Sequence, residues 1–163
     1  MQTFTEKHHF DQPASFVLKQ FTNPDFLRTK YTALGRQEIE MLEHQQDAKQ
    51  ARLRLRYSDK PDMDVPDFAR KLVPARATVT QTVQWNLEKK TGEVKVESSS
   101  PITVRCTLHL QDEGKGCSNT LKWEVSCSVP LIGGKLEKAL AEGLKQKSKR
   151  DEAESRRLLA AAT

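Results

Sequence analysis

The sequence predicts an α+β domain in which a curved antiparallel sheet of about six to seven strands wraps around a long C-terminal helix. Three observations lead to this fold class. Most of the chain alternates apolar and polar residues with the period of two that half-buried strands show. Two short segments after the first alternating stretch have helical spacing, and so does the whole C-terminal part after Gly133. The length of 163 residues fits one domain.

The N-terminal part predicts one strand followed by two short helices. Residues 3–10 alternate loosely and form the strand. Pro13 is suited to the first turn of a helix, and we expect this helix to end at Asn23-Pro24, because a residue before proline disfavours helical geometry. Asp25 can cap a second helix. Gly35 ends that helix, since glycine tolerates the backbone conformation that follows a helix.

From residue 36 the apolar period changes to two. Residues 36–44 and 51–57 are separated by a turn at 45–47 and therefore predict a hairpin. Four further strands are predicted around residues 79–87, 93–98, 102–110 and 121–129. Together they form an antiparallel meander with one wet and one buried face. Residues 58–74 interrupt the strands, with one or two helical turns expected over 67–72.

The long helix begins after Pro130 and Gly133-Gly134, where the glycines allow a close approach to the sheet. Leu136, Leu140 and Leu144 recur every four residues and give its first half an apolar stripe. Beyond Ser148 the pattern is strongly charged. We therefore expect the domain to occupy residues 1–150, with residues 151–163 forming a helical extension that projects beyond the core and frays.

Several segments are similar to the START / polyketide cyclase / Bet v 1-like (SRPBCC) superfamily, and specifically to a bacterial branch of it that is classed as a domain of unknown function. The segments that carry the resemblance are Phe4–Phe10, Pro13-Ala14, Leu34-Gly35, Asp64-Val65-Pro66 before Phe68, Gln81–Trp85 and Val129–Glu137. The chain departs from the family at residues 113–120, where Cys117 stands in a link that is often rich in Gly and Thr. The resemblance implies the helix-grip fold and carries over no catalytic residue.

A twisted sheet of this size curls, and a helix on its concave side leaves space that is typical of a small-molecule site. We expect the cavity to be lined by residues on the inward phase of the strands and on the helix stripe: Met41, Leu53, Leu55, Phe68, Gln81, Trp85, Leu108, Trp123, Val125, Leu136 and Leu140. Phe68 would belong to a flap over the cavity mouth. The leading hypothesis is that the cavity binds a hydrophobic or amphipathic small molecule, such as a fatty acid, an isoprenoid or an aromatic metabolite.

Other interpretations of these residues stay open. Trp85 and Trp123 could simply fill the core instead of lining a cavity. Gln81 is an inward polar side chain, so it needs a partner, either a backbone or water partner or the polar head of a ligand. A cyclase- or dehydratase-type enzyme would need inward-facing carboxylate or histidine side chains. A protein-interaction module would have a cavity filled by its own side chains.

The sequence predicts no catalytic residue, no metal site and no cofactor. His8 and His9 point to opposite faces of one strand, and no Cys or His has the spacing of zinc ligands. Gly133-Gly134 lacks the spacing of a phosphate-binding loop. Cys106 and Cys127 fall on the apolar phase of their strands, whereas Cys117 is predicted to be exposed in a turn.

The formal charge of +5 is modest, and the chain is 36% hydrophobic and 30% charged. A basic run at Lys145, Lys147, Lys149 and Arg150 is followed by acidic residues, which favours ion pairing within the helix. The alternative is a peripheral contact with an anionic membrane. Nucleic acid is not expected as a partner. An odd number of cysteines, together with no recognisable signal peptide, predicts a cytoplasmic protein.

Overall fold

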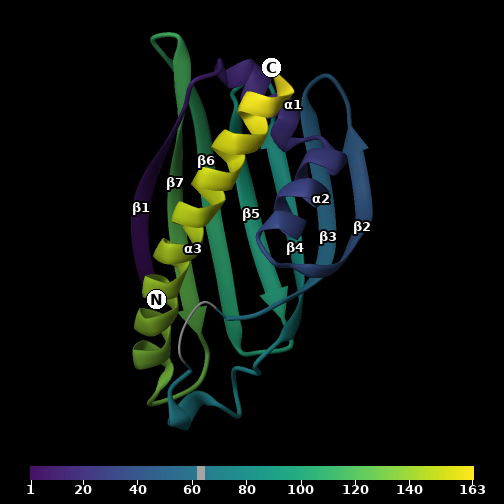
Figure 1. Ribbon diagram of the computed structural model, residues 1–163. Helices are drawn as coiled ribbons and strands as arrows, with labels where there is room; N and C mark the ends of the chain where they lie inside the picture. Colours follow the sequence, from purple (N-terminus) through teal and green to yellow (C-terminus); the bar gives the residue numbers. More distant parts are fainter. Residues whose placement is uncertain (62–64) are drawn as a thin grey trace.

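The structure is a computed structural model that describes residues 1–61 and 65–163. One antiparallel sheet of seven strands in the order β1-β7-β6-β5-β4-β3-β2 is crossed by the long helix α3 (Figure 1). The elements are β1 Gln2–Phe10, α1 Ala14–Phe21, α2 Pro24–Ala33, β2 Gln37–Gln46, β3 Gln50–Asp59, the 3-10 helix η1 Asp67–Ala69, β4 Ala77–Asn86, β5 Thr91–Ser98, β6 Ile102–Glu113, β7 Gly116–Cys127 and α3 Gly133–Ala162. The predicted α+β helix-grip architecture is confirmed. Asp64 of the Asp64-Val65-Pro66 segment lies outside the described residues.

The sheet follows from simple chain connectivity. Strands β2 to β7 are consecutive antiparallel neighbours, and β1 pairs with β7 over its whole length, from Gln2 opposite Val125 to Phe10 opposite Cys117. In β3, the alternation predicted from the sequence buries Ala51, Leu53, Leu55 and Tyr57 on the inner face. The inner face is therefore apolar along most of its strands.

Strands β1 and β2 are the two edges of the sheet. β2 pairs irregularly with β3, with register shifts between Gln37 and Glu40 and between Met41 and Glu43. Glu38 in the first shift has a positive φ of 54°. These features are β-bulges, which bend and twist a strand locally.

Helices α1 and α2 carry the chain from β1 to β2 and cover the inner face near β3 and β4 (Figure 1). The N-cap of α2 is Asn23, whose side chain accepts a hydrogen bond of 2.9 Å from the Asp25 backbone N–H. The prediction that Asp25 would be the cap was therefore wrong. Asn23-Pro24 ends α1 and also begins α2, because proline is tolerated in the first turn. Gly35 follows α2 with a φ of 86°, as predicted.

Helix α3 starts against the end of β7 and runs across the concave face of the sheet (Figure 1). A Cβ atom on Gly133 would lie 3.0 Å from the Cys127 carbonyl oxygen. A contact this short with a backbone atom is unfavourable, so glycine favours the close approach of the helix to the strand. The packing role expected for the glycine pair belongs to Gly133, since a Cβ on Gly134 would meet no neighbouring atom.

The C-terminal end of α3 remains packed on the domain, although we expected residues 151–163 to project and fray. Ser155 and Leu159 are fully buried, and Leu159 belongs to the main hydrophobic core. The Arg156 Nε donates a hydrogen bond of 2.8 Å to the backbone oxygen of His9. One face of this charged segment carries the contacts at a spacing of four residues, and its charges lie mostly on the other faces.

The hydrophobic core is divided into two clusters. The larger cluster packs α1, α2 and the end of α3 on the inner face of the sheet. A small cluster of Ala69, Val73 and Leu136 lies at the beginning of α3. The middle turns of α3, around Leu144 and Ser148, lie between the two clusters and do not belong to either of them.

The packing of the C-terminal turns is testable with Leu159→Ala. Removing this fully buried side chain should lower the free energy of unfolding by about 2–5 kcal/mol, measured by urea denaturation. The control is Leu131→Ala, which truncates a fully exposed leucine and should change stability by less than about 0.5 kcal/mol. Equal stability of the two variants would mean that residues 151–163 do not contribute to the core.

Candidate functional site

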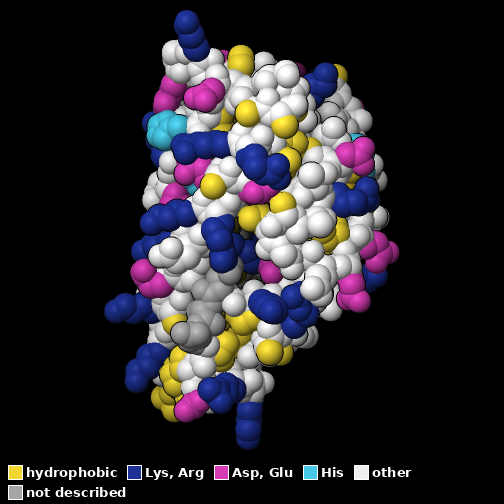
Figure 2. Space-filling model, in the orientation of Figure 1, with side chains coloured by type: hydrophobic (Ala, Val, Ile, Leu, Met, Phe, Trp, Pro, Cys, Tyr) yellow, Lys and Arg dark blue, Asp and Glu magenta, His cyan; other side chains and the backbone are white. Residues whose placement is uncertain are grey.

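A cavity lies between the inner face of the sheet and the middle turns of α3. Its volume is about 170 Å³. Figure 2 shows a hollow beside α3 on the face of the molecule that it draws, where the cavity would open. A single water molecule needs roughly 10–15 Å³ on the same basis, so the space is large enough for an organic molecule. The cavity is lined by His8, Phe21, Leu27, Lys30, Tyr31, Arg36, Tyr57, Gln81, Val83, Trp85, Val94, Val96, Val104, Cys106, Leu108, Asn119, Leu121, Trp123, Leu144, Lys147, Ser148 and Asp151.

Strand alternation accounts for the apolar wall of the cavity. Every second residue of β4, β5, β6 and β7 points inward, which brings residues 81–85, 94–96, 104–108 and 119–123 to one surface. Gly92 lies opposite Trp85, and a Cβ there would come within 2.8 Å of the indole ring. Because Gly92 has no side chain, the Trp85 indole can lie against β5.

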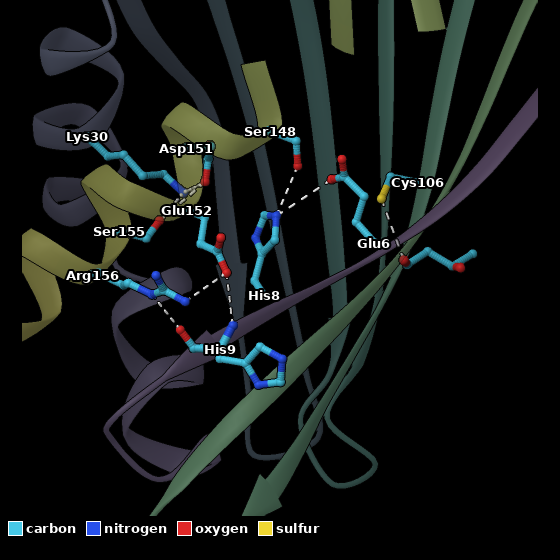
Figure 3. Close-up of polar contacts among 11 residues, drawn as sticks. Glu6, His8, His9, Lys30, Cys106, Ser148, Asp151, Glu152, Ser155 and Arg156 are labelled. Carbon is cyan, nitrogen blue, oxygen red and sulfur yellow. Dashed lines mark hydrogen bonds and ion pairs between the residues drawn. The ribbon is translucent and has the colours of Figure 1, made fainter. Parts of the chain in front are cut away.

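The opposite wall is polar and begins with an ion pair between α2 and α3. Lys30 Nζ lies 3.2 Å from Asp151 Oδ1 and donates to Ser155 Oγ at 3.4 Å (Figure 3). Burial alone would raise the pKa of the Asp151 carboxyl. The positive charges of Lys30 and Arg36 outweigh this effect and hold the pKa below its ordinary value. Asp151 is therefore a carboxylate at neutral pH.

His8 reaches the cavity from the inner face of β1. Its Nε2 lies 3.0 Å from Ser148 Oγ and 3.6 Å from Glu6 Oε2 (Figure 3). Serine and glutamate therefore contact the same ring nitrogen, which differs from a catalytic triad, where they contact opposite nitrogens. Burial lowers the pKa of His8 below its ordinary value, although Glu152, Asp151 and Glu6 oppose the shift. The imidazole is consequently neutral at pH 7 and can accept a proton.

A guanidinium held between two tyrosine rings completes the polar wall. The Cζ of Arg36 lies 3.9 Å from the ring centre of Tyr31 and 4.6 Å from that of Tyr57. Its Nε is 3.5 Å from Asp59 Oδ2, and Lys147 also pairs with Asp59. Such cation–π contacts stabilise a buried arginine partly, without using its N–H groups.

Gln81 is held by the same two tyrosines. The Tyr57 hydroxyl donates to Gln81 Oε1 at 2.8 Å, and Gln81 Nε2 donates to the Tyr31 hydroxyl at 2.5 Å. The partners of the Gln81 amide are therefore two side chains. The sequence had suggested a backbone or water partner, or the polar head of a ligand. Burial raises the pKa of Tyr57, so its hydroxyl stays protonated and remains a donor.

A second pocket of about 160 Å³ adjoins the cavity at the start of α3. The two spaces share Tyr57, Val96, Val104, Leu144 and Lys147 in their walls. A ligand longer than the main cavity would extend in this direction.

The predicted site residues fall into three groups. Gln81, Trp85, Leu108 and Trp123 line the cavity, and Leu140 lines the second pocket. The others are packed in or against the cores or lie outside both spaces: Met41, Leu53, Leu55, Val125 and Leu136 are at least partly buried, and Phe68 is 48% exposed. Leu53 and Leu55 have the predicted inward phase, but they belong to the core cluster that includes α1 and α2. Ligand binding by the lining residues stays a prediction.

The polar wall was missed by sequence reasoning. His8, Lys30, Arg36 and Asp151 come from four different elements or loops, and nothing in their spacing brings them together. One signal was available for His8, because it shares the inward phase of β1 with Phe10. Arg36 follows α2 after Leu34 and Gly35, in a loop where an exposed arginine is the ordinary expectation.

Cys106 and Cys117 are poor nucleophiles. Cys117 is buried in β7, so the prediction that it would be exposed was wrong. Burial raises its pKa to about 11, and burial also raises the pKa of Cys106. Both thiols therefore stay protonated at neutral pH. Within residues 1–61 and 65–163, no group of His, Cys, Asp and Glu side chains has the arrangement of a metal site.

Comparison with known proteins gives a family and a fold. Residues 5–159 match the family described as "Protein of unknown function (DUF2505)". No curated protein matches the chain. Among the described residues, none of the helices is long and apolar enough to cross a membrane.

Solved structures share the fold over nearly the whole chain. TTHA0849 from Thermus thermophilus has a TM-score of 0.71 at 15% identity, with 99% of each chain covered. The Zhui aromatase/cyclase from Streptomyces sp. R1128 has a TM-score of 0.64 at 10% identity, covering 98% of this chain and 93% of that one. A START superfamily protein from Mycobacterium smegmatis has a TM-score of 0.60 at 11% identity, covering 96% and 98%. At these identities the likeness is one of fold.

Buried His8 should make stability depend on pH. Well above about pH 6.5, the ordinary pKa of histidine, the imidazole is neutral in both states and has no effect. As the pH falls below that value, the unfolded chain takes up the proton first, so the free energy of unfolding decreases. The lowered pKa of Asp151 acts in the same direction at more acidic pH, since the stabilisation it provides is lost as the carboxylate is protonated.

We predict that His8→Gln loses less stability than the wild type between about pH 7.5 and pH 5.5, measured by urea unfolding at several pH values. His9→Gln, which changes the exposed neighbour, should lose as much as the wild type. Parallel pH profiles for all three proteins would contradict the assignment.

Proposed function

The chain belongs to the DUF2505 family, and we propose that it binds a hydrophobic or amphipathic small molecule in the cavity between the sheet and α3. One observation carries this proposal: the apolar inner face of β4 to β7 is held apart from α3, with the cavity between them. The structural neighbours named as a START superfamily protein and as an aromatase/cyclase support it through their common fold.

Burial of apolar surface would drive binding. Each Å² of apolar ligand surface removed from water contributes about 25 cal/mol, before the costs of ordering the ligand. The walls supply valine, leucine and tryptophan side chains for this contact, among them Val83, Leu108 and Trp123. A protein-interaction module with a filled cavity is less favoured, because the space between sheet and helix is not filled by side chains.

Both tryptophans of the chain line the cavity, so their fluorescence would report on a bound molecule. The first experiment is native mass spectrometry of the protein as purified, with organic extraction of any added mass. The second is a titration with octanoic acid, followed by tryptophan emission. If neither experiment detects a bound molecule, the proposal is contradicted.

Trp123→Ala should weaken uptake by about tenfold or more, because the indole borders the cavity and stacks on Phe4 with ring centres 6.0 Å apart. The matched control is Leu55→Ala, which truncates a fully buried side chain outside the cavity wall. It should destabilise the fold and keep its affinity. If uptake falls in proportion to lost stability in both variants, the site assignment is wrong.

Acid–base catalysis in the same cavity is the second candidate, the cyclase- or dehydratase-type alternative. The observation that favours it is a neutral histidine, His8, facing the same space as the carboxylate of Asp151. A general base of this kind would remove a proton next to a carbonyl group. The structural relationship to an aromatase/cyclase is compatible with this chemistry and adds only the fold.

Deuterium exchange distinguishes the two candidates. The probe is 2-tetralone, an apolar ketone with exchangeable α-protons, incubated with protein in D₂O. A catalytic His8 would speed exchange by about 100-fold over buffer, and His8→Gln would abolish the gain. If the wild type and His8→Gln leave the exchange rate at the buffer value, the protein has no such base.

Contact of the basic helix with an anionic membrane remains a prediction, as does a cytoplasmic location. Lys145 pairs with Glu142 of the same helix at 3.0 Å, which favours the interpretation of ion pairing within the helix, whereas Lys147 pairs with Asp59 of β3. Co-sedimentation with phosphatidylserine vesicles measures the membrane contact. Binding that does not weaken on Lys149→Glu would contradict a role for this helix.

A further inference from the structure

We infer that the cavity is specific for a monocarboxylic acid, with the carboxylate held by Arg36 and the apolar skeleton along β4 to β7. This inference rests on the proposed function and names the chemical class of its ligand. It starts from the polar atoms that the fold buries without a partner.

Among the described side chains, the buried nitrogen and oxygen atoms without a hydrogen-bond partner belong to Glu6, Arg36, Trp85, Asn119 and Trp123. Four of these five residues line the cavity. In native proteins most buried polar atoms are hydrogen-bonded, and an unpartnered one is costly. Their concentration around one space indicates that the groups serve a molecule that enters it.

Arg36 determines the charge of that molecule. Its side chain is only 7% exposed, and its Nε and Nη1 have no hydrogen-bond partner. The rings of Tyr31 and Tyr57 hold the guanidinium in place without providing a hydrogen-bond acceptor for Nε and Nη1. A buried guanidinium attracts an anion with oxygen acceptors, because charge-assisted hydrogen bonds are the strongest that it can make.

The neighbouring carboxylates do not replace this anion. Asp59 lies 3.5 Å from Arg36 Nε without forming a hydrogen bond, and it is already paired with Lys147. Asp151 is paired with Lys30 at 3.2 Å and also accepts a hydrogen bond from Ser155. Each carboxylate is thus engaged by a lysine, and the guanidinium keeps unsatisfied donors.

The charge balance of the cluster favours a singly charged ligand. Asp59 and Asp151 are each paired with a lysine, so the charge of Arg36 is the one left uncompensated, and a carboxylate matches it, whereas a phosphate monoester carries nearly two negative charges at neutral pH. At the other wall, the Trp85 and Trp123 N–H groups can donate to an oxygen atom on the skeleton of the ligand. The pattern fits an acid whose body is apolar and carries one or more oxygen functions.

The experiment compares acids with alcohols of the same skeleton by titration calorimetry at pH 7.5. The probes are octanoic acid against 1-octanol, 2-naphthoic acid against 2-naphthalenemethanol, and octyl phosphate. We expect the wild type to bind at least one acid about tenfold or more tightly than its alcohol and more tightly than octyl phosphate. Arg36→Gln should lose this preference and keep its affinity for the alcohol, which also shows that the variant is folded.

Two further variants keep the test sharp. Arg36→Lys preserves the charge without the planar fork, and it should retain part of the preference. Arg105→Gln removes an exposed arginine on the outer face of β6 and should behave as the wild type.

The outcomes separate the two proposals. Equal binding of acid and alcohol by the wild type, tighter binding of octyl phosphate, or a preference that survives in Arg36→Gln would overturn the carboxylate assignment while leaving a binding cavity. Binding of none of the probes would instead contradict the proposed function itself.

Discussion

One long helix and two short ones have to cover the concave face of a seven-stranded sheet, and most of the structure follows from that constraint. Helix α3 is fixed at its beginning by the contact of Gly133 with β7 and at its end by buried Leu159. Helices α1 and α2 cover the inner face next to β3. The middle of α3 therefore bridges between two packed regions, and the inner face beneath it remains uncovered. The cavity is the space that this arrangement of helices leaves unfilled.

The polar wall has a cost for folding, because charged groups lose their hydration when they are buried. Lys30, Asp151, Asp59 and Arg36 are largely withdrawn from water at the junction of α2, α3 and β3. An apolar set of the same volume would often be equally stable or more stable. A cluster of this composition therefore argues for a role beyond stability, and recognition of a ligand is the role that its position favours.

The sequence predicted the elements and the phase of the strands, because alternation is a local property of the chain. It placed Trp85, Trp123, Leu108 and Gln81 on the inner face, where they line the cavity. It could not separate them from Leu53 and Leu55, which have the same phase. That distinction depends on where α1 and α2 pack, and no local pattern records this.

The charged residues of the polar wall could not be predicted from the sequence either. Lys30, Arg36 and Asp151 resemble ordinary surface residues in the sequence and become neighbours only when α2, the following loop and α3 meet. The C-terminal end of α3 was misjudged for a related reason. Its composition is dominated by exposed charges, and the contact with the core depends on few side chains, chiefly Ser155 and Leu159.

The irregular edge of the sheet has a consequence for behaviour at high concentration. A regular, uncovered edge strand is a template on which another chain can extend the sheet, and this is a route to aggregation. In β2 the two register shifts and the left-handed Glu38 interrupt the row of backbone donors and acceptors. Exposed Glu38 also places a charged side chain on this edge, a feature that natural edge strands use against pairing with another chain. The bulges that bend β2 thus also protect the protein against edge-to-edge self-association.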